Sequence, residues 1–206
     1  MLELFSKEKE QPFIPNFPNG ELYYYPAFLT PSEADKLYRN FYTETNWQAD
    51  KITVFGKTYD QPRLTALYAL EPTPYTYSNI TMHPLPMTKS LLDLIQKIND
   101  VYEHGFNAVL LNLYRDGKDS NGWHADNEAE LGQNPVIASI SLGEERYFHL
   151  KHRTQKEQRL KIKLKHGSLL VMGGTMQHHW LHQIPKTTKI ISPRINLTFR
   201  KIIPQG

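Results

Sequence analysis

The C-terminal half of the chain is divided by turn-forming residues into short segments of strand length. From Phe106 onward, glycine, proline and asparagine separate runs rich in Val, Ile, Leu, Phe and Thr. Short strands with regularly spaced turn signals are typical of a β-sandwich, a β-barrel or a jelly roll. We expect these strands at residues 106–114, 136–142, 146–152, 158–165, 168–172, 178–184 and 193–202.

The N-terminal half predicts two helices in front of this β-region. Thr30-Pro31-Ser32-Glu33 is typical of a helix start, with a capping threonine, proline at the first helical position and glutamate three residues after the cap. Residues 89–103 carry an apolar stripe at helical spacing and predict a second helix. Helices packed on a double sheet give an α+β domain. We expect shorter strands at 21–28, 47–55, 59–68 and 75–81, after an irregular lead-in over residues 1–20.

The composition fits one globular domain over residues 21–206, because 206 residues with 39% hydrophobic content can bury a sizeable core. No apolar run approaches the roughly 20 residues of a membrane span, and the N-terminus lacks the apolar segment of a secretory signal. We therefore expect an intracellular monomer, cytoplasmic or nuclear, with no membrane partner. The chain has no cysteine, so any metal must be held by His, Asp or Glu.

The last expected strand has two chemically different faces. Side chains alternate along a strand, so Ile195, Leu197 and Phe199 share one face, and the other holds Arg194, Asn196, Thr198 and Arg200. If the polar face points inward, it suits a small carboxylate, because guanidinium groups match carboxylates in charge and geometry. The two arginines lie roughly 20 Å apart along an extended strand, so they hold two ends of a ligand or converge on it. The alternative is an edge strand with a solvated face.

Two histidine-containing segments predict a metal site. His124 and Asp126 project to one side of extended backbone and can share one ion. A third ligand comes from His178-His179-Trp180-Leu181-His182, in which we expect His178 and His182 on one face and His179 on the other. Two histidines and one carboxylate are the ligands of non-haem Fe(II) oxygenases. Hydrolytic zinc sites use similar ligands, so the ligand types alone leave the chemistry open.

Taken together, these residues resemble the AlkB family of Fe(II)/2-oxoglutarate dioxygenases. The resemblance runs from about residue 20 to residue 203 and keeps the order and spacing of the family motifs. Those motifs are Asn112-x-Tyr114, His124-x-Asp126, His182 and Arg194-x-Asn196-x-Thr198-x-Arg200.

The resemblance implies a double-stranded β-helix (jelly roll) with N-terminal helices and a nucleotide-recognition lid. The lid is expected at about 47–83 and the jelly-roll core at about 106–203. By the same resemblance Fe(II) is held by His124, Asp126 and His182, with O2 as co-substrate. It implies that 2-oxoglutarate is held by Asn112, Tyr114, Arg194, Asn196 and Arg200, with Arg194 on the distal carboxylate. His178 and His179 then have structural roles.

The lid carries the expected contacts to the substrate base, apart from Glu128. Val54-Phe55-Gly56-Lys57 resembles the hairpin tip that wedges an aromatic ring into a base stack, where the gap left by a flipped base must be filled. Tyr75 and Tyr77 resemble residues that line a base pocket, and Glu128 stands where the family places an acid against the base. The other possibilities are a Phe55 and tyrosines that belong to the core, and a solvated loop charge at Glu128.

A basic block follows in the expected hairpin. Residues 151–165 contain seven Lys and Arg against one acid, Glu157. Arg153 and Lys156 are the expected phosphate contacts in this block, because such charge beside a base pocket suits nucleic acid. A solvated hairpin is the alternative.

The reaction that the resemblance implies is oxidative demethylation of 1-methyladenine and 3-methylcytosine in DNA, single- or double-stranded, with release of formaldehyde. Three alternatives remain open: the same chemistry on RNA, oxidation of a substrate other than nucleic acid, and an inactive nucleic-acid-binding module. The basic block and the Phe55 tip favour a nucleic acid.

Overall fold

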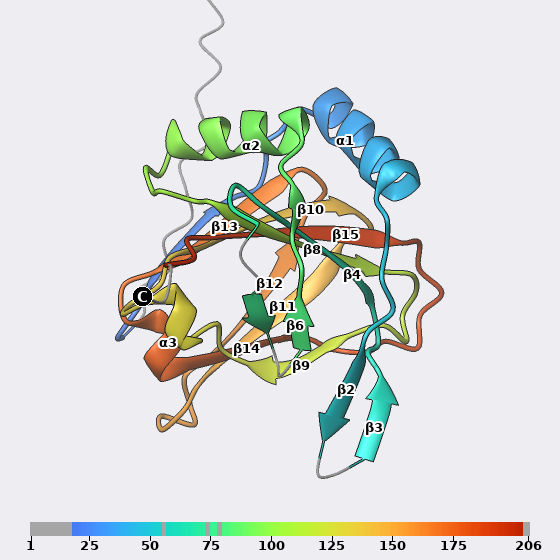
Figure 1. The fold of residues 1–206 in the computed structure, drawn as a ribbon. Coiled ribbons are helices and arrows are strands. Elements are labelled where there is room, and N and C mark those ends of the chain that lie inside the picture. The colour runs from blue at the N-terminus through green and yellow to red at the C-terminus, as the bar shows by residue number, and fades with distance from the viewer. Residues whose placement is uncertain (1–17, 55–56, 73–74, 78–79, 204–206) are drawn as a thin grey trace, which may run out of the picture.

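Two β-sheets face each other in the computed structural model, which describes residues 18–203 except 55–56, 73–74 and 78–79 (Figure 1). For residues 52–54, 57, 75–77 and 80–81 the description covers the backbone alone. In spatial order, the larger sheet contains β1 (Glu21–Tyr25), β13 (Ser168–Gly173), β10 (Ile137–Gly143), β15 (Arg194–Arg200), β8 (Ala108–Tyr114), β4 (Leu64–Ala69) and β7 (Leu85–Pro86). The smaller sheet contains β12 (Arg159–Leu164), β11 (Arg146–His152), β14 (Trp180–Ile184) and β9 (Asn121–His124).

The strands from β8 to β15 form a jelly roll. Four of them lie in the larger sheet in the order β13-β10-β15-β8, and the other four make up the smaller sheet. The chain therefore crosses between the sheets several times, which brings segments distant in sequence side by side. The space between the sheets is filled by an inner core of residues from both, for example Leu110 and Met172 from the larger and Phe148 and Leu150 from the smaller. The jelly roll expected from the sequence is confirmed.

Two helices cover the outer face of the larger sheet, above it in Figure 1. The first, α1 (Pro31–Glu44), begins at the expected capping box, in which Thr30 accepts from the Glu33 amide and Glu33 accepts from the Thr30 amide. The second, α2 (Lys89–Asn99), ends four residues before the expected residue 103. Its apolar stripe is buried against the sheet and includes Leu91 and Ile98. No helix in the described part of the chain has the length and apolar character needed to cross a membrane.

Strand β15 lies near the middle of the larger sheet, between β10 and β8. Its apolar residues Ile195, Leu197 and Phe199 belong to the outer core beneath the helices. Its polar residues therefore face the space between the sheets, as alternation along a strand requires. The inward polar face is confirmed, and the solvated edge strand is excluded.

The strands differ from the expected ones at several places, and β9 and β7 were not expected at all. The 59–68 stretch splits into β3 (Lys57–Asp60) and β4, and the 75–81 stretch is a hairpin of β5 (Tyr75–Tyr77) and β6 (Ile80–Met82). The expected strand 178–184 begins two residues late, because α3 (Met176–His179) occupies the start of the segment. The strand assignment of His178 and His179 was therefore wrong, and His178 does not share a strand face with His182. The expected hairpin around residues 54–57 is confirmed as far as its strands, since β2 (Lys51–Val54) and β3 pair antiparallel with Val54 opposite Lys57; residues 55–56 lie outside the described residues.

A leucine pair tests the outer core. Leu197→Ala removes a side chain with 0% exposure from beneath the helices and should lower the free energy of unfolding by about 3–5 kcal/mol, as buried leucine truncations do. Leu92→Ala, at a side chain with 43% exposure on α2, should cost less than about 0.5 kcal/mol. Urea unfolding measures both, and equal losses would contradict the assigned core.

Candidate active site

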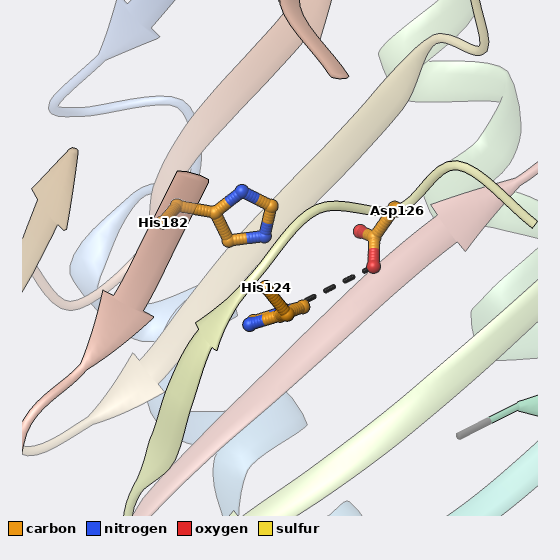
Figure 2. Close-up of side chains that lie close together, drawn as sticks. All are labelled: His124, Asp126 and His182. Carbon is orange, nitrogen blue, oxygen red and sulfur yellow. Dashed lines mark ion pairs between the residues drawn. The ribbon is translucent and has the colours of Figure 1, made fainter. Parts of the chain in front are cut away.

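Three metal-ligating side chains converge between the sheets. His124 ends β9, Asp126 follows it by two residues, and His182 lies on β14 (Figure 2). One ligand atom from each lies within 4.8 Å of the others, and this is the one such group among the described residues. The antiparallel pairing of β9 and β14 sets His182 directly opposite His124, with ring centroids 4.2 Å apart. Strand register thus assembles the cluster that the sequence predicted.

The tautomer of His124 follows from its hydrogen bonds. Its Nδ1 lies 2.7 Å from the carbonyl oxygen of Gly122. A carbonyl can only accept, so Nδ1 carries the proton and Nε2 keeps a lone pair. Nε2 lies 3.9 Å from Asp126 Oδ1 on the side of the cluster. A histidine held in this way through its other nitrogen is typical of a metal ligand.

Asp126 is buried and held from two directions. Its Oδ1 accepts from Arg200 Nη2 at 3.0 Å, and its backbone N–H donates to Gln177 Oε1 at 3.0 Å. Burial opposes ionisation, but the charge of Arg200 and the neighbouring His182 and His124 outweigh it and lower the pKa of Asp126 to about 2. The carboxylate is therefore charged at neutral pH.

Both histidines are neutral at neutral pH. Burial, followed by the nearby His124, lowers the pKa of His182 to about 3. Burial also lowers the pKa of His124, although Asp126 opposes the shift. Neutral imidazole and ionised carboxylate are the forms that bind metal. The three residues consequently fit a divalent cation.

Polar side chains of β15 and β8 form the facing wall. The register places Arg194 opposite Tyr114 and Asn196 opposite Asn112. Two of these side chains are already oriented by neighbours, since Asn112 Oδ1 accepts from Arg63 Nε and Asn196 Nδ2 donates to Ser139 Oγ, each at 2.8 Å.

Arg194 is a buried cation that has no carboxylate partner among the described residues. Its exposure is 1%, its Nη2 donates to Ser141 Oγ at 2.8 Å, and its guanidinium carbon lies 5.3 Å from the centre of the Tyr114 ring. Nε and Nη1 are buried without a hydrogen-bond partner in the described structure. Burial lowers the pKa of Arg194 to about 10, so the group remains charged at neutral pH. A carboxylate placed here would satisfy both the charge and the two donors.

A cavity between the two walls joins the metal ligands to most of these residues. Arg194 itself lies behind it, next to Tyr114 and Ser141. The lining comprises Asn112, Tyr114, Asn121, His124, Asp126, Ile137, Ser139, Phe148, Met172, His182, Ile184, Asn196, Thr198 and Arg200.

Glu128 lies two residues beyond Asp126, at the start of the short helix η1 (Ala129–Leu131). Its Oε2 is buried without a hydrogen-bond partner among the described residues. Burial and the charge of Asp126 raise the pKa of Glu128 to about 7. Its contact with a substrate base remains a prediction.

The other expected substrate residues are only partly described. Phe55 lies outside the described residues, and Tyr75 and Tyr77 are described in their backbone alone. Arg153 and Lys156 are exposed in the turn between β11 and β12. Their roles remain predictions.

His178 lies away from the metal ligands, with Nε2 2.9 Å from Asn134 Oδ1. Four residues that the sequence reasoning missed also shape the site. Arg63, Ser139, Ser141 and Gln177 orient the polar residues named above through their side chains. Each is an ordinary residue in its own segment, so no local signal marks it.

Comparison with known proteins gives the family. Residues 21–200 match the model of the 2OG-Fe(II) oxygenase superfamily. The chain is 36% identical to "DNA oxidative demethylase ALKBH2" of Mus musculus, over 87% of this chain and 80% of that protein. This chain belongs to the AlkB family. It is also 42% identical to "Alpha-ketoglutarate-dependent dioxygenase alkB homolog 3" of Mus musculus over 87% of its length, and it spans 65% of that relative.

The fold comparison agrees with this membership. The solved "structure of OsALKBH1" superposes with a TM-score of 0.62 over 90% of this chain and 99% of the other, at 18% identity. The superfamily whose model matches is named for Fe(II) and 2-oxoglutarate (2OG). The His-Asp-His cluster fits the iron, and the two unmatched donors of buried Arg194 fit a carboxylate of 2-oxoglutarate.

The low histidine and aspartate pKa values predict a metal affinity that varies little with pH. With the pKa of His182 near 3 and that of Asp126 near 2, no proton must leave these ligands at neutral pH. The dissociation constant for Mn(II) should change less than about twofold between about pH 8 and pH 6. Electron paramagnetic resonance of free Mn(II) measures it.

His182→Ala serves as the control in the same titration. It should weaken Mn(II) by more than the roughly 10–100-fold that loss of an outer-shell partner costs. A roughly threefold loss of wild-type affinity on going from pH 7 to pH 6 would show a histidine ligand with an ordinary pKa of about 6.5, against the burial found here.

Proposed function

We propose that this protein removes N-methyl groups from nucleobases in DNA by oxidation and releases formaldehyde. The proposed lesions are 1-methyladenine and 3-methylcytosine. The proposal rests mainly on one observation: the His-Asp-His cluster lines a cavity together with Tyr114 and Arg200, and Arg194 is buried next to Tyr114. Support also comes from a 36% identical relative that is named a DNA oxidative demethylase.

The chain's own residues hold and separate the reactants. His124, Asp126 and His182 would hold Fe(II), which together with 2-oxoglutarate and O2 supplies the oxidising power for a C–H bond. Arg194 would bind the distal carboxylate of 2-oxoglutarate, since its buried Nε and Nη1 have no hydrogen-bond partner in the described structure. Arg200 keeps Asp126 ionised and in place through their 3.0 Å ion pair.

The substrate would enter as a flipped base. Oxidation of the N-methyl group gives an N-hydroxymethyl group, which loses formaldehyde and restores the N–H or the ring nitrogen. A methyl group on the Watson–Crick edge weakens pairing, and weaker pairing lowers the cost of extruding the base. The β2–β3 hairpin, which projects from the jelly roll in Figure 1, is the proposed element that enters the base stack.

Arg194→Ala tests the cofactor assignment. Loss of a buried charge partner should raise the KM for 2-oxoglutarate by at least about 30-fold, equivalent to about 2 kcal/mol, and should leave Mn(II) affinity within about twofold. Arg39→Ala on the exposed face of α1 is the matched control and should leave the KM unchanged. A KM for the Arg194 variant that equals the wild-type value would remove Arg194 from the cofactor site.

The reaction itself is tested with methylated oligonucleotides. Protein loaded anaerobically with Fe(II) and 2-oxoglutarate is mixed with air and an oligonucleotide containing 1-methyladenine, as single-stranded DNA, duplex DNA or RNA. From DNA we expect one formaldehyde for each adenine restored. The His182→Ala variant should give neither product.

Other outcomes of this assay would change the proposed substrate or the proposed reaction. Faster repair of RNA than of DNA would change the substrate class and keep the chemistry. Succinate without formaldehyde would point to a substrate other than a methylated base. Failure to form succinate with any of these substrates would contradict the demethylase proposal.

A further inference from the structure

The outer face of the smaller sheet carries exposed aromatic rings among cations. Trp123 on β9 is 39% exposed and does not line the cavity, unlike Asn121 and His124 of the same strand. On β11 the buried and accessible positions alternate, so Tyr147 and Lys151 point outward. On β12 the outward positions are Arg159, Lys161 and Lys163. We call the surface formed by Trp123, Tyr147, Lys151, Arg159, Lys161 and Lys163 the outer platform.

Each ring of the outer platform has a lysine over it. Lys151 Nζ lies 4.2 Å from the ring centre of Trp123, and Lys161 Nζ lies 3.8 Å from that of Tyr147. Trp123 is 39% exposed and Tyr147 is 44% exposed, so parts of both rings remain open to solvent. The platform therefore contains two units of the same kind, each an open aromatic ring beside an ammonium group.

The arrangement across the strands keeps the two units on one surface. Register pairs Tyr147 with Lys163 and Lys151 with Arg159, and Lys151 reaches across β14 to Trp123. At about 4.8 Å between neighbouring strands, two strand spacings separate Trp123 on β9 from Tyr147 on β11 by roughly 10 Å in that direction. A single extended ligand can thus contact both rings.

The charge of the platform selects an anionic ligand. Glu145 engages Lys163, which leaves Lys151, Arg159 and Lys161 as cations with no acidic side chain paired to them in the described structure. Residues 151–165 hold seven Lys and Arg against one acid. A repeated ring-plus-cation unit matches a nucleotide chain, in which every base offers a π-face and every linkage a phosphate.

We propose that the outer platform binds single-stranded nucleic acid, with bases stacked on Trp123 and Tyr147 and phosphates bound by Lys151 and Lys161. That the bound strand is the one that carries the methylated base rests on the proposed demethylase function. β9 is the edge strand of the smaller sheet, so a strand whose methylated base enters the cavity inside β9 can continue around that edge onto the platform. Stacking requires unpaired bases, so the platform favours single strands over duplexes.

Binding of an unmethylated strand tests the platform without any turnover. A labelled oligothymidylate of about 16 nucleotides, within the site sizes of stacking grooves, is titrated by fluorescence anisotropy with the full chain. Tyr147→Ala should weaken binding about fivefold or more, as loss of one stacking residue does, and Tyr147→Phe should restore it. Tyr42→Ala is the matched control, since Tyr42 on α1 is also 44% exposed, and should bind as the wild type does.

Tryptophan fluorescence gives a second readout that needs no truncation. The chain has three tryptophans, and Trp123 is the exposed one, whereas Trp47 and Trp180 are partly or fully buried. Stacking should quench the wild-type emission to saturation as oligothymidylate is added. Trp123→Phe should lose this quenching and keep most of the affinity.

Two results would overturn the proposal. One is equal affinity of wild type, Tyr147→Ala and Tyr42→Ala while Lys151→Gln and Lys161→Gln bind more weakly, because this would show charge attraction without stacking. The other is emission that remains unquenched at saturation. Since the strand is unmethylated, failure of the demethylation assay with quenching intact would reject only the proposed function, and the reverse pattern would reject only the platform.

Discussion

The buried ion pair between Arg200 and Asp126 fixes the geometry on which the rest of the site depends. The two groups are 74 residues apart in the chain and 3.0 Å apart in space, and both are almost fully buried. Loss of either partner would leave an isolated charge in the protein interior, at a cost of about 3–5 kcal/mol. The pair joins β15 of the larger sheet to the loop that follows β9 of the smaller one. The position of Asp126 beside His124 is thereby tied to closure of the jelly roll.

Strand β15 couples stability to chemistry because both of its faces are buried. The apolar face anchors the helices through Ile195, Leu197 and Phe199, and the polar face presents Arg194, Asn196 and Arg200 to the site. A slip of one residue in register would exchange the two faces. It would place arginines beneath the helices and leucine beside the metal ligands. The hydrophobic core therefore specifies the register that the site requires.

The sequence predicted those features that depend on local periodicity. Alternation in β15 predicted its two faces, the Thr30 cap predicted the start of α1, and turn residues separated seven of the eight strands of the jelly roll; β9 was missed. Features that depend on contacts between distant segments were missed. Gln177 holds Asp126 across 51 residues and Arg63 orients Asn112 across 49. Helix α3 was predicted as strand because its four residues are too few to show the periodicity of a helix.

The net charge of the buried site determines which ligands it favours. Arg194 and Arg200 bring two positive charges into the cavity region and Asp126 brings one negative charge, while burial keeps His182 neutral. The excess of positive charge favours a dianion, and a divalent metal increases that excess. Each ligand changes the electrostatic potential at the other ligand's site. The dicarboxylate offsets the repulsion between the metal and the arginines, and the metal strengthens the attraction for the dicarboxylate. Reciprocal coupling between the two sites follows from this arrangement, since any factor by which one ligand raises the affinity for the other must act equally in the opposite direction.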